Sequence, residues 1–185
     1  MSGMNEIERL IATAELPELG PGPRGGVQAE VALNKALDEL FRGVKLAAEN
    51  QQLIRSLVLL WHDHLDAGHT IAQNIDGADG AFVHGIMHRR EPDYGNAKYW
   101  FRRVGEHPAF PKIASRVTTL LETKGQSDLR DKLMPGGEWD AFAFVDCCEQ
   151  AKRRSADESQ KGLLREVQGI ESRVLLERYW DEGLA

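Results

Sequence analysis

The chain has 185 residues and a formal net charge of −6, with 42% hydrophobic and 28% charged residues. These values are typical of a soluble globular protein with a sizeable core. The negative charge argues against general nucleic-acid binding, and no apolar stretch is long enough to cross a membrane. The acidic first residues lack the basic and apolar regions of a signal peptide, which predicts a cytoplasmic protein.

The first 26 residues are predicted to form an amphipathic helix over residues 4–14 and then an arm. The arm, residues 15–26, is rich in proline and glycine, which favour irregular backbone. From residue 27 onward, apolar positions recur every three or four residues, as on one face of a helix. Residues 27–185 are therefore predicted to form a single helical domain.

The predicted helices of this domain are separated by turn-forming residues. One begins at residue 27, a long helix covers 46–75, and a third covers roughly 80–90 and ends before Pro92. A short helix or turn-rich segment follows over 93–107, and helices are predicted over 111–124, 138–153 and 157–181. No segment alternates polar and apolar residues as a strand does. The predicted fold class is all-α, an irregular helical bundle of five to seven helices.

Two features near the C-terminus have mainly structural interpretations. Cys147 and Cys148 are the only cysteines and are adjacent, which excludes a disulfide framework. The last predicted helix carries an apolar stripe, which suits either core packing or contact within a homodimer; it comprises Leu163, Val167, Ile170, Val174 and Leu175.

All six histidines lie between positions 62 and 107. Because each residue advances about 100° around a helix, Asp66 and His69 would lie within about 40° of His62 on one face of the predicted long helix. The following helix repeats this spacing, His-x3-His-x2-Glu, with His84, His88 and Glu91. If the chain reverses near residues 76–77, His69 lies level with His84 across an antiparallel hairpin.

Imidazoles and carboxylates are the ligands of Zn²⁺, Fe²⁺ and Mn²⁺, and facing helices of a bundle supply them from both sides. The hairpin therefore predicts a divalent metal site (Zn, Fe or Mn), and the rings of His69 and His84 must then lie within roughly 8 Å of each other. The candidate ligands are His62, Asp66, His69, His84 and His88.

Residues 84–112 form a basic island in an acidic protein, with six Lys and Arg against three Asp and Glu. Arginine offers a planar set of donors that suits carboxylate or phosphate groups. Near a metal, this island predicts metal-assisted hydrolysis of a small anionic substrate. The candidates are Glu91 or Asp66 as general base, Arg89 and Arg90 as anion-binding residues, and Asp93 and Tyr94 as further substrate contacts.

Two alternatives have no metal chemistry. The hairpin could be locked by a hydrogen-bonded network of histidines and carboxylates, or it could line a non-catalytic small-molecule pocket. His64 would lie on another face of the long helix, and neither His64 nor His107 is assigned to the site by its spacing.

The run HGIMHRREPDYGNAKYWFRRVG, residues 84–105, resembles a block in bacterial and fungal helical proteins that have no assigned activity. The His-x3-His helix within a chain of this length also resembles the DinB/YfiT-like metal-binding helical bundles. That resemblance implies that one upstream histidine joins His84 and His88 at a metal. In that family the pair lies nearer the C-terminus, whereas here a long helical stretch follows it.

Overall fold

The computed structural model of the protein describes residues 3–153 and 157–184. Within these ranges the chain forms ten α-helices and a short 3₁₀ helix, and it contains no strand. Leu46 and Leu184 pair only as an isolated antiparallel bridge. None of the helices in the described ranges is both long and apolar enough to span a membrane.

The helices follow one another closely from α2 onward. They are α1 (Gly3–Leu10), α2 (Glu30–Arg42), α3 (Ala48–Trp61), α4 (Leu65–Ala72), α5 (Gly77–Arg90), α6 (Tyr94–Val104), α7 (Phe110–Thr123), α8 (Ser127–Leu133), η1 (Pro135–Gly137), α9 (Ala141–Arg153) and α10 (Glu158–Gly183).

Helix α5 is the centre of the fold. Every residue from Gly80 to Arg90 is buried, and α3, α4 and α6 pack against this helix. A helix that is enclosed on all sides has no solvent face on which to place charged residues. Its histidines and arginines must therefore be held by partners inside the protein.

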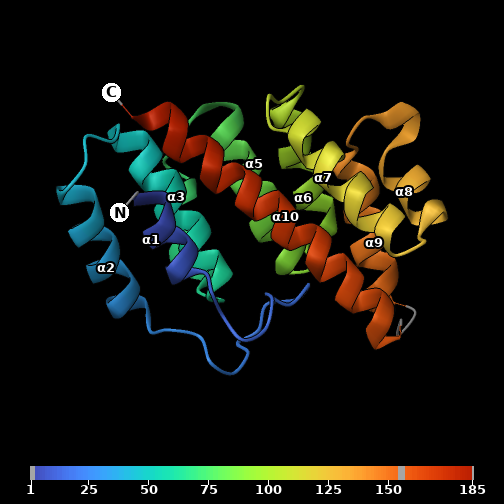
Figure 1. Ribbon diagram of the computed structural model, residues 1–185, viewed down its shortest axis with the longest axis horizontal. Helices are drawn as coiled ribbons and strands as arrows, with labels where there is room; N and C mark the ends of the chain where they lie inside the picture. Colours follow the sequence, from blue (N-terminus) through green and yellow to red (C-terminus); the bar gives the residue numbers. More distant parts are fainter. Residues whose placement is uncertain (1–2, 154–156, 185) are drawn as a thin grey trace.

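Helix α10 spans the molecule and joins its two ends. It has 26 residues, which corresponds to about 39 Å of helix. It packs against α1 and α3 near one end and against α7 and α9 toward the other, and it crosses the view diagonally in Figure 1. The apolar stripe predicted on this helix faces the core, because Leu163, Val167, Val174 and Leu175 are buried.

The predicted bundle of five to seven helices is wrong, although the all-helical class is correct for the described residues. The segment 46–75 was predicted as one helix, whereas α3 ends at Trp61 and α4 begins at Leu65. Helix α8 occupies residues for which the sequence pattern predicted no element.

The break between α3 and α4 is a helix C-terminus without glycine. Asp63 has a φ of +66°, in the left-handed region that glycine usually occupies at this position. The His64 N–H donates to the Leu59 carbonyl and the Asp63 N–H to the Leu60 carbonyl, which is the hydrogen-bond pattern of a Schellman motif. Aspartate tolerates this conformation better than most residues, and its buried carboxylate has strong partners, described below.

The packing between α5 and α6 depends on one small residue. A Cβ atom at Gly85 would lie 2.8 Å from the ring of Phe101, so a larger residue would force the helices apart. This close approach also brings Trp100, the residue before Phe101 on α6, against the ring of His84, with ring centroids 4.0 Å apart.

Candidate metal centre

Three histidines from two helices come together at the centre of the molecule. The ring centroids of His69 on α4 and His84 on α5 are 5.0 Å apart, and those of His69 and His88 are 5.4 Å apart. One ring nitrogen from each histidine lies within 4.8 Å of the other two. The predicted pairing of His69 with His84 across the α4–α5 turn is therefore confirmed.

Helix geometry explains this meeting. His84 and His88 are four residues apart on α5 and so share one face, and their rings are stacked with centroids 5.9 Å apart. The turn between Gln73 and Asp76 reverses the chain, and α4 then packs along α5. His69 is thereby placed edge-on against both rings.

The site favours neutral imidazoles. Burial, together with the neighbouring His69 and His88, lowers the pKa of His84 to about 4. Burial also lowers the pKa of His88, although the Glu91 carboxylate opposes that shift. Neutral imidazole is the form that binds a metal, so these two rings need lose no proton near pH 7 before binding one.

The ring of His84 is buried with an incomplete set of hydrogen bonds. The residue is 2% exposed, and within the described residues its Nδ1 has no partner with good hydrogen-bond geometry, although the Gly80 carbonyl one turn earlier on α5 interacts with the side chain. Such orphaned polar atoms are uncommon in protein interiors and often mark a bound ion or water. Trp100 stacks flat on this ring, and Arg103 packs on the Trp100 ring at 5.3 Å.

Two polar side chains surround His88. The Glu91 carboxylate lies 3.1 Å from Nδ1, and the Asn96 amide nitrogen lies 3.1 Å from Nε2 and 3.3 Å from Nδ1. Glu91 is the residue that ends α5, and Asn96 belongs to the first turn of α6. The predicted general base Glu91 is thus placed beside a histidine of the cluster.

Two of the five predicted metal ligands lie apart from the three-histidine cluster. Asp66 is exposed in the first turn of α4. His62 is fully buried, but its Nδ1 accepts a hydrogen bond from the Gln28 N–H and its Nε2 donates to the Leu10 carbonyl. The prediction that His62, Asp66 and His69 share one helix face is wrong, because the chain turns at Asp63.

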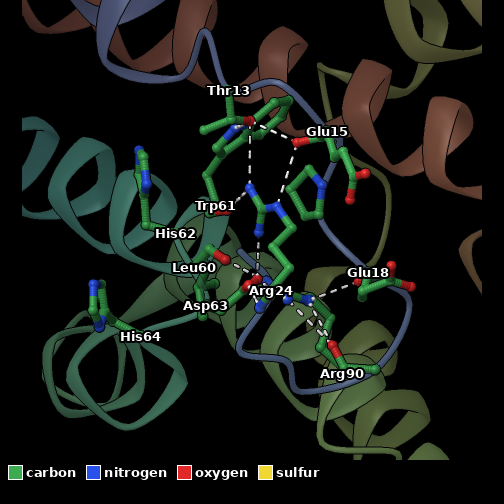
Figure 2. A network of polar contacts seen from close by, with 12 residues as sticks. Thr13, Glu15, Glu18, Arg24, Leu60, Trp61, His62, Asp63, His64 and Arg90 are labelled. Carbon is green, nitrogen blue, oxygen red and sulfur yellow. Dashed lines mark hydrogen bonds and ion pairs between the residues drawn. The ribbon is translucent and has the colours of Figure 1, made fainter. Parts of the chain in front are cut away.

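The His62-to-His64 turn holds the N-terminal arm instead. Asp63 Oδ1 accepts hydrogen bonds from Arg24 and Arg90, each at 2.6 Å, and its Oδ2 accepts from the Arg24 backbone N–H. Figure 2 shows the two guanidinium groups converging on this carboxylate, while His62 and His64 point away from it. His64 donates to the Gln28 carbonyl, just after the arm.

Both predicted anion-binding arginines are buried in internal ion pairs. Besides Asp63, Arg90 donates to the carbonyls of Glu18, Gly20 and Leu60 (Figure 2). Arg89 pairs with Glu171 of α10 at 2.5 and 3.2 Å, and both side chains are fully buried. In this arrangement both guanidinium groups are paired with carboxylates inside the protein, although Nε of Arg89 has no hydrogen-bond partner within the described residues.

The other residues singled out from the sequence lie at the edges of the site or outside it. Asp93 accepts from the Asn96 backbone N–H and so caps α6. Tyr94 lines a surface cavity of about 360 Å³ together with Cys148, and burial raises its pKa to about 12. His107 bonds Asp79, at the start of α5, across 2.9 Å.

Sequence reasoning missed the stacking of Trp100 on His84. Trp100 is the middle one of three consecutive aromatic residues, and its position in the sequence does not connect it with His84. The available signal was Gly85, which lies next to His84 and allows the close approach of α6.

The comparisons with known proteins gave no match. No protein family, no curated protein and no solved structure was found to match this chain. The chain is thus an all-helical protein with a three-histidine cluster, and its function must be argued from that cluster.

Proposed function

We propose that this protein binds one divalent transition-metal ion through His69, His84 and His88. The observation that carries the proposal is the convergence of three ring nitrogens within 4.8 Å of one another at a buried position. A tetrahedral ion with bonds of about 2.1 Å places its ligand nitrogens about 3.4 Å apart. Each pair of nitrogens therefore needs to close by about 1.4 Å at most, which small side-chain rotations provide.

The ligand chemistry favours some metals over others. Three imidazoles suit Zn²⁺ or Fe²⁺, whereas Mn²⁺ prefers oxygen ligands. Three protein ligands also leave a coordination position open, as in catalytic zinc sites, and structural zinc sites usually have four. The half-buried His69 and Asn96 lie at this cluster, so the open position faces the more accessible side of the site.

The open position supports metal-assisted hydrolysis as the use of the site. A water molecule bound there would be the nucleophile, because a metal lowers its pKa toward neutrality. Arg103, exposed on α6 and packed on Trp100, is a better candidate for binding a small anionic substrate than the internally paired Arg89 and Arg90. Of the two predicted bases, Glu91 lies beside the cluster, and its carboxylate oxygen that is not paired with His88 is the one left for this role, whereas Asp66 lies apart from the cluster.

One observation favours a different role for the same residues. His88 is hydrogen-bonded to Glu91 and Asn96, and the three histidine rings pack closely, as in a polar network that fastens α4 to α5 and α6. In this alternative the cluster is structural and binds no ion.

Metal analysis of protein purified without a histidine tag separates the two roles. After chelator treatment and addition of one equivalent of Zn²⁺ or Fe²⁺, we expect about one bound ion per chain. A His84→Ala variant should lose it. A metal present at a hundred times its Kd should stabilise the wild type by about 2.7 kcal/mol, and the gain should be visible in thermal unfolding.

The matched control is His64→Gln, which changes a histidine outside the cluster and keeps a side chain that can donate to Gln28. It should bind metal like the wild type, and circular dichroism should show that both variants are folded. A wild type without stoichiometric metal, or a folded His84→Ala variant with full metal content, would refute the proposed site.

A further inference from the structure

The ring of His88 has more polar contacts than the other two rings of the cluster. Its Nδ1 lies 3.1 Å from the Glu91 carboxylate, and the Asn96 amide nitrogen contacts Nε2 at 3.1 Å. The His88 ring is buried, at 7% exposure, whereas Glu91 is exposed and Asn96 is half-buried, so the contacts lie at the edge of the buried site. The inference below rests on the proposed metal site and concerns how its third ligand is prepared.

The contacts determine where the proton of His88 lies. An ionised carboxylate only accepts hydrogen bonds, so the Nδ1 that faces Glu91 must carry the proton. A metal binds the neutral form of the ring, and with the proton on Nδ1 the free lone pair of that form is on Nε2. The Asn96 amide nitrogen is almost equally far from both ring nitrogens, which places it over the face of the ring and not in the ring plane, where the Nε2 lone pair points.

We propose that His88 binds the metal through Nε2, that Glu91 is the positioning residue that fixes this tautomer, and that the Asn96 amide packs on the face of the ring. Glu91 then forms the second layer of the site, a carboxylate–histidine–metal arrangement that orients the ring and increases its basicity. Asn96 restrains the ring from its face and does not occupy the Nε2 lone pair.

The chain offers a matched control for the role of Glu91. Asp93 lies in the same loop, and its charge also acts on His88, but its side chain bonds the Asn96 backbone and not the ring. Asparagine is as good a helix cap as aspartate, so Asp93→Asn removes the charge while keeping the cap. Comparing Glu91 with Asp93 therefore separates the hydrogen bond from a general effect of negative charge.

Zn²⁺ affinity measured by competition with a chromogenic chelator tests Glu91. We expect Glu91→Ala to weaken binding by about 10- to 100-fold, the range for loss of such second-layer carboxylates. Glu91→Gln retains a neutral acceptor for the Nδ1 proton and should recover part of the loss, and Asp93→Asn should stay within about threefold of wild type. The absorption bands of bound Co²⁺ should shift in Glu91→Ala and not in Asp93→Asn. An Asp93→Asn loss equal to that of Glu91→Ala would overturn the assignment.

Asn96 predicts a smaller change. Asn96→Ala leaves the Glu91 contact and the Nε2 lone pair in place, so Zn²⁺ affinity should stay within about threefold of wild type. Long-range ¹⁵N NMR of chelator-treated wild type should show His88 protonated on Nδ1. A proton on Nε2, or an Asn96→Ala loss equal to that of Glu91→Ala, would overturn the inference while leaving the metal site intact. A wild type that binds no Zn²⁺ at all would overturn both proposals.

Discussion

Acid should destabilise the protein through His84, in a pH range set by burial. The pKa of this side chain is about 4 in the folded protein, against an ordinary value of 6.5 in the unfolded chain. Between these values the unfolded chain binds a proton that the folded protein does not, so stability falls as the pH falls. The stability that the neutral His84 contributes is therefore fully present above pH 6.5, and it is fully lost below about pH 4. The difference between the two values corresponds to about 3 kcal/mol.

A His84→Phe variant isolates this contribution. Phenylalanine keeps a flat ring against Trp100, carries no proton and leaves no orphaned polar atom. Urea denaturation of chelator-treated protein at pH 7.0, 5.5 and 4.5 measures the free energy of unfolding of both proteins. We expect the wild type to lose about 2–3 kcal/mol more than the variant between pH 7.0 and 4.5.

Comparing the wild type with His84→Phe cancels the effects of the other titrating groups on the free energy of unfolding. Burial also lowers the pKa of His62, and the carboxyl group of Glu177 has a lowered pKa, but both groups are present in wild type and variant alike. His64→Gln, outside the cluster, should follow the wild-type profile. If the unfolding free energies of wild type and His84→Phe fall in parallel from pH 7.0 to 4.5, then burial does not hold this ring neutral and the electrostatic argument for a prepared ligand fails.

Three further predictions concern the surroundings of the site. Asp63→Ala leaves two buried arginines unpaired and should lower the free energy of unfolding by about 3–5 kcal/mol, as measured by urea denaturation. Residues 15–26 should also be cleaved faster by a protease, and an arm that stays uncleaved would contradict this prediction. Glu171→Ala should cost a similar amount, and the double variant Arg89→Met, Glu171→Leu should recover most of it. Burial raises the pKa of Cys148 to about 12, so its thiol should react with Ellman's reagent only when the protein is unfolded.

The register of the histidine hairpin could be predicted from the sequence because only local rules are involved. A turn near residue 76 and the period of 3.6 residues per helical turn are enough to bring His69 level with His84. The end of α3 could not be predicted in the same way. It depends on a left-handed Asp63, and the residues that compensate its buried charge are Arg24 and Arg90, which are 39 and 27 positions away in the sequence.

The basic island was misleading for a related reason. A count of arginines in a segment indicates how much positive charge must be accommodated, but not where its partners lie. The partner of Arg89 is Glu171, which is 82 positions away on α10, so the local excess of charge is neutralised inside the fold. Only the exposed members of the island, such as Arg102 and Arg103 on α6, keep their charge at the surface.

The difference between the two kinds of buried histidine lies in their ring nitrogens. In His62 one nitrogen donates to the Leu10 carbonyl and the other accepts from the Gln28 N–H, so no lone pair is left for an ion. In His84, Nδ1 has no well-formed hydrogen bond among the described residues, and in His88 the Asn96 amide lies over the ring face, out of the plane in which the Nε2 lone pair points. Both kinds of ring are buried and neutral, and both occur in the same hairpin. Hydrogen-bond satisfaction, which spacing alone does not reveal, therefore distinguishes a histidine that holds the arm from one that is ready to bind a metal.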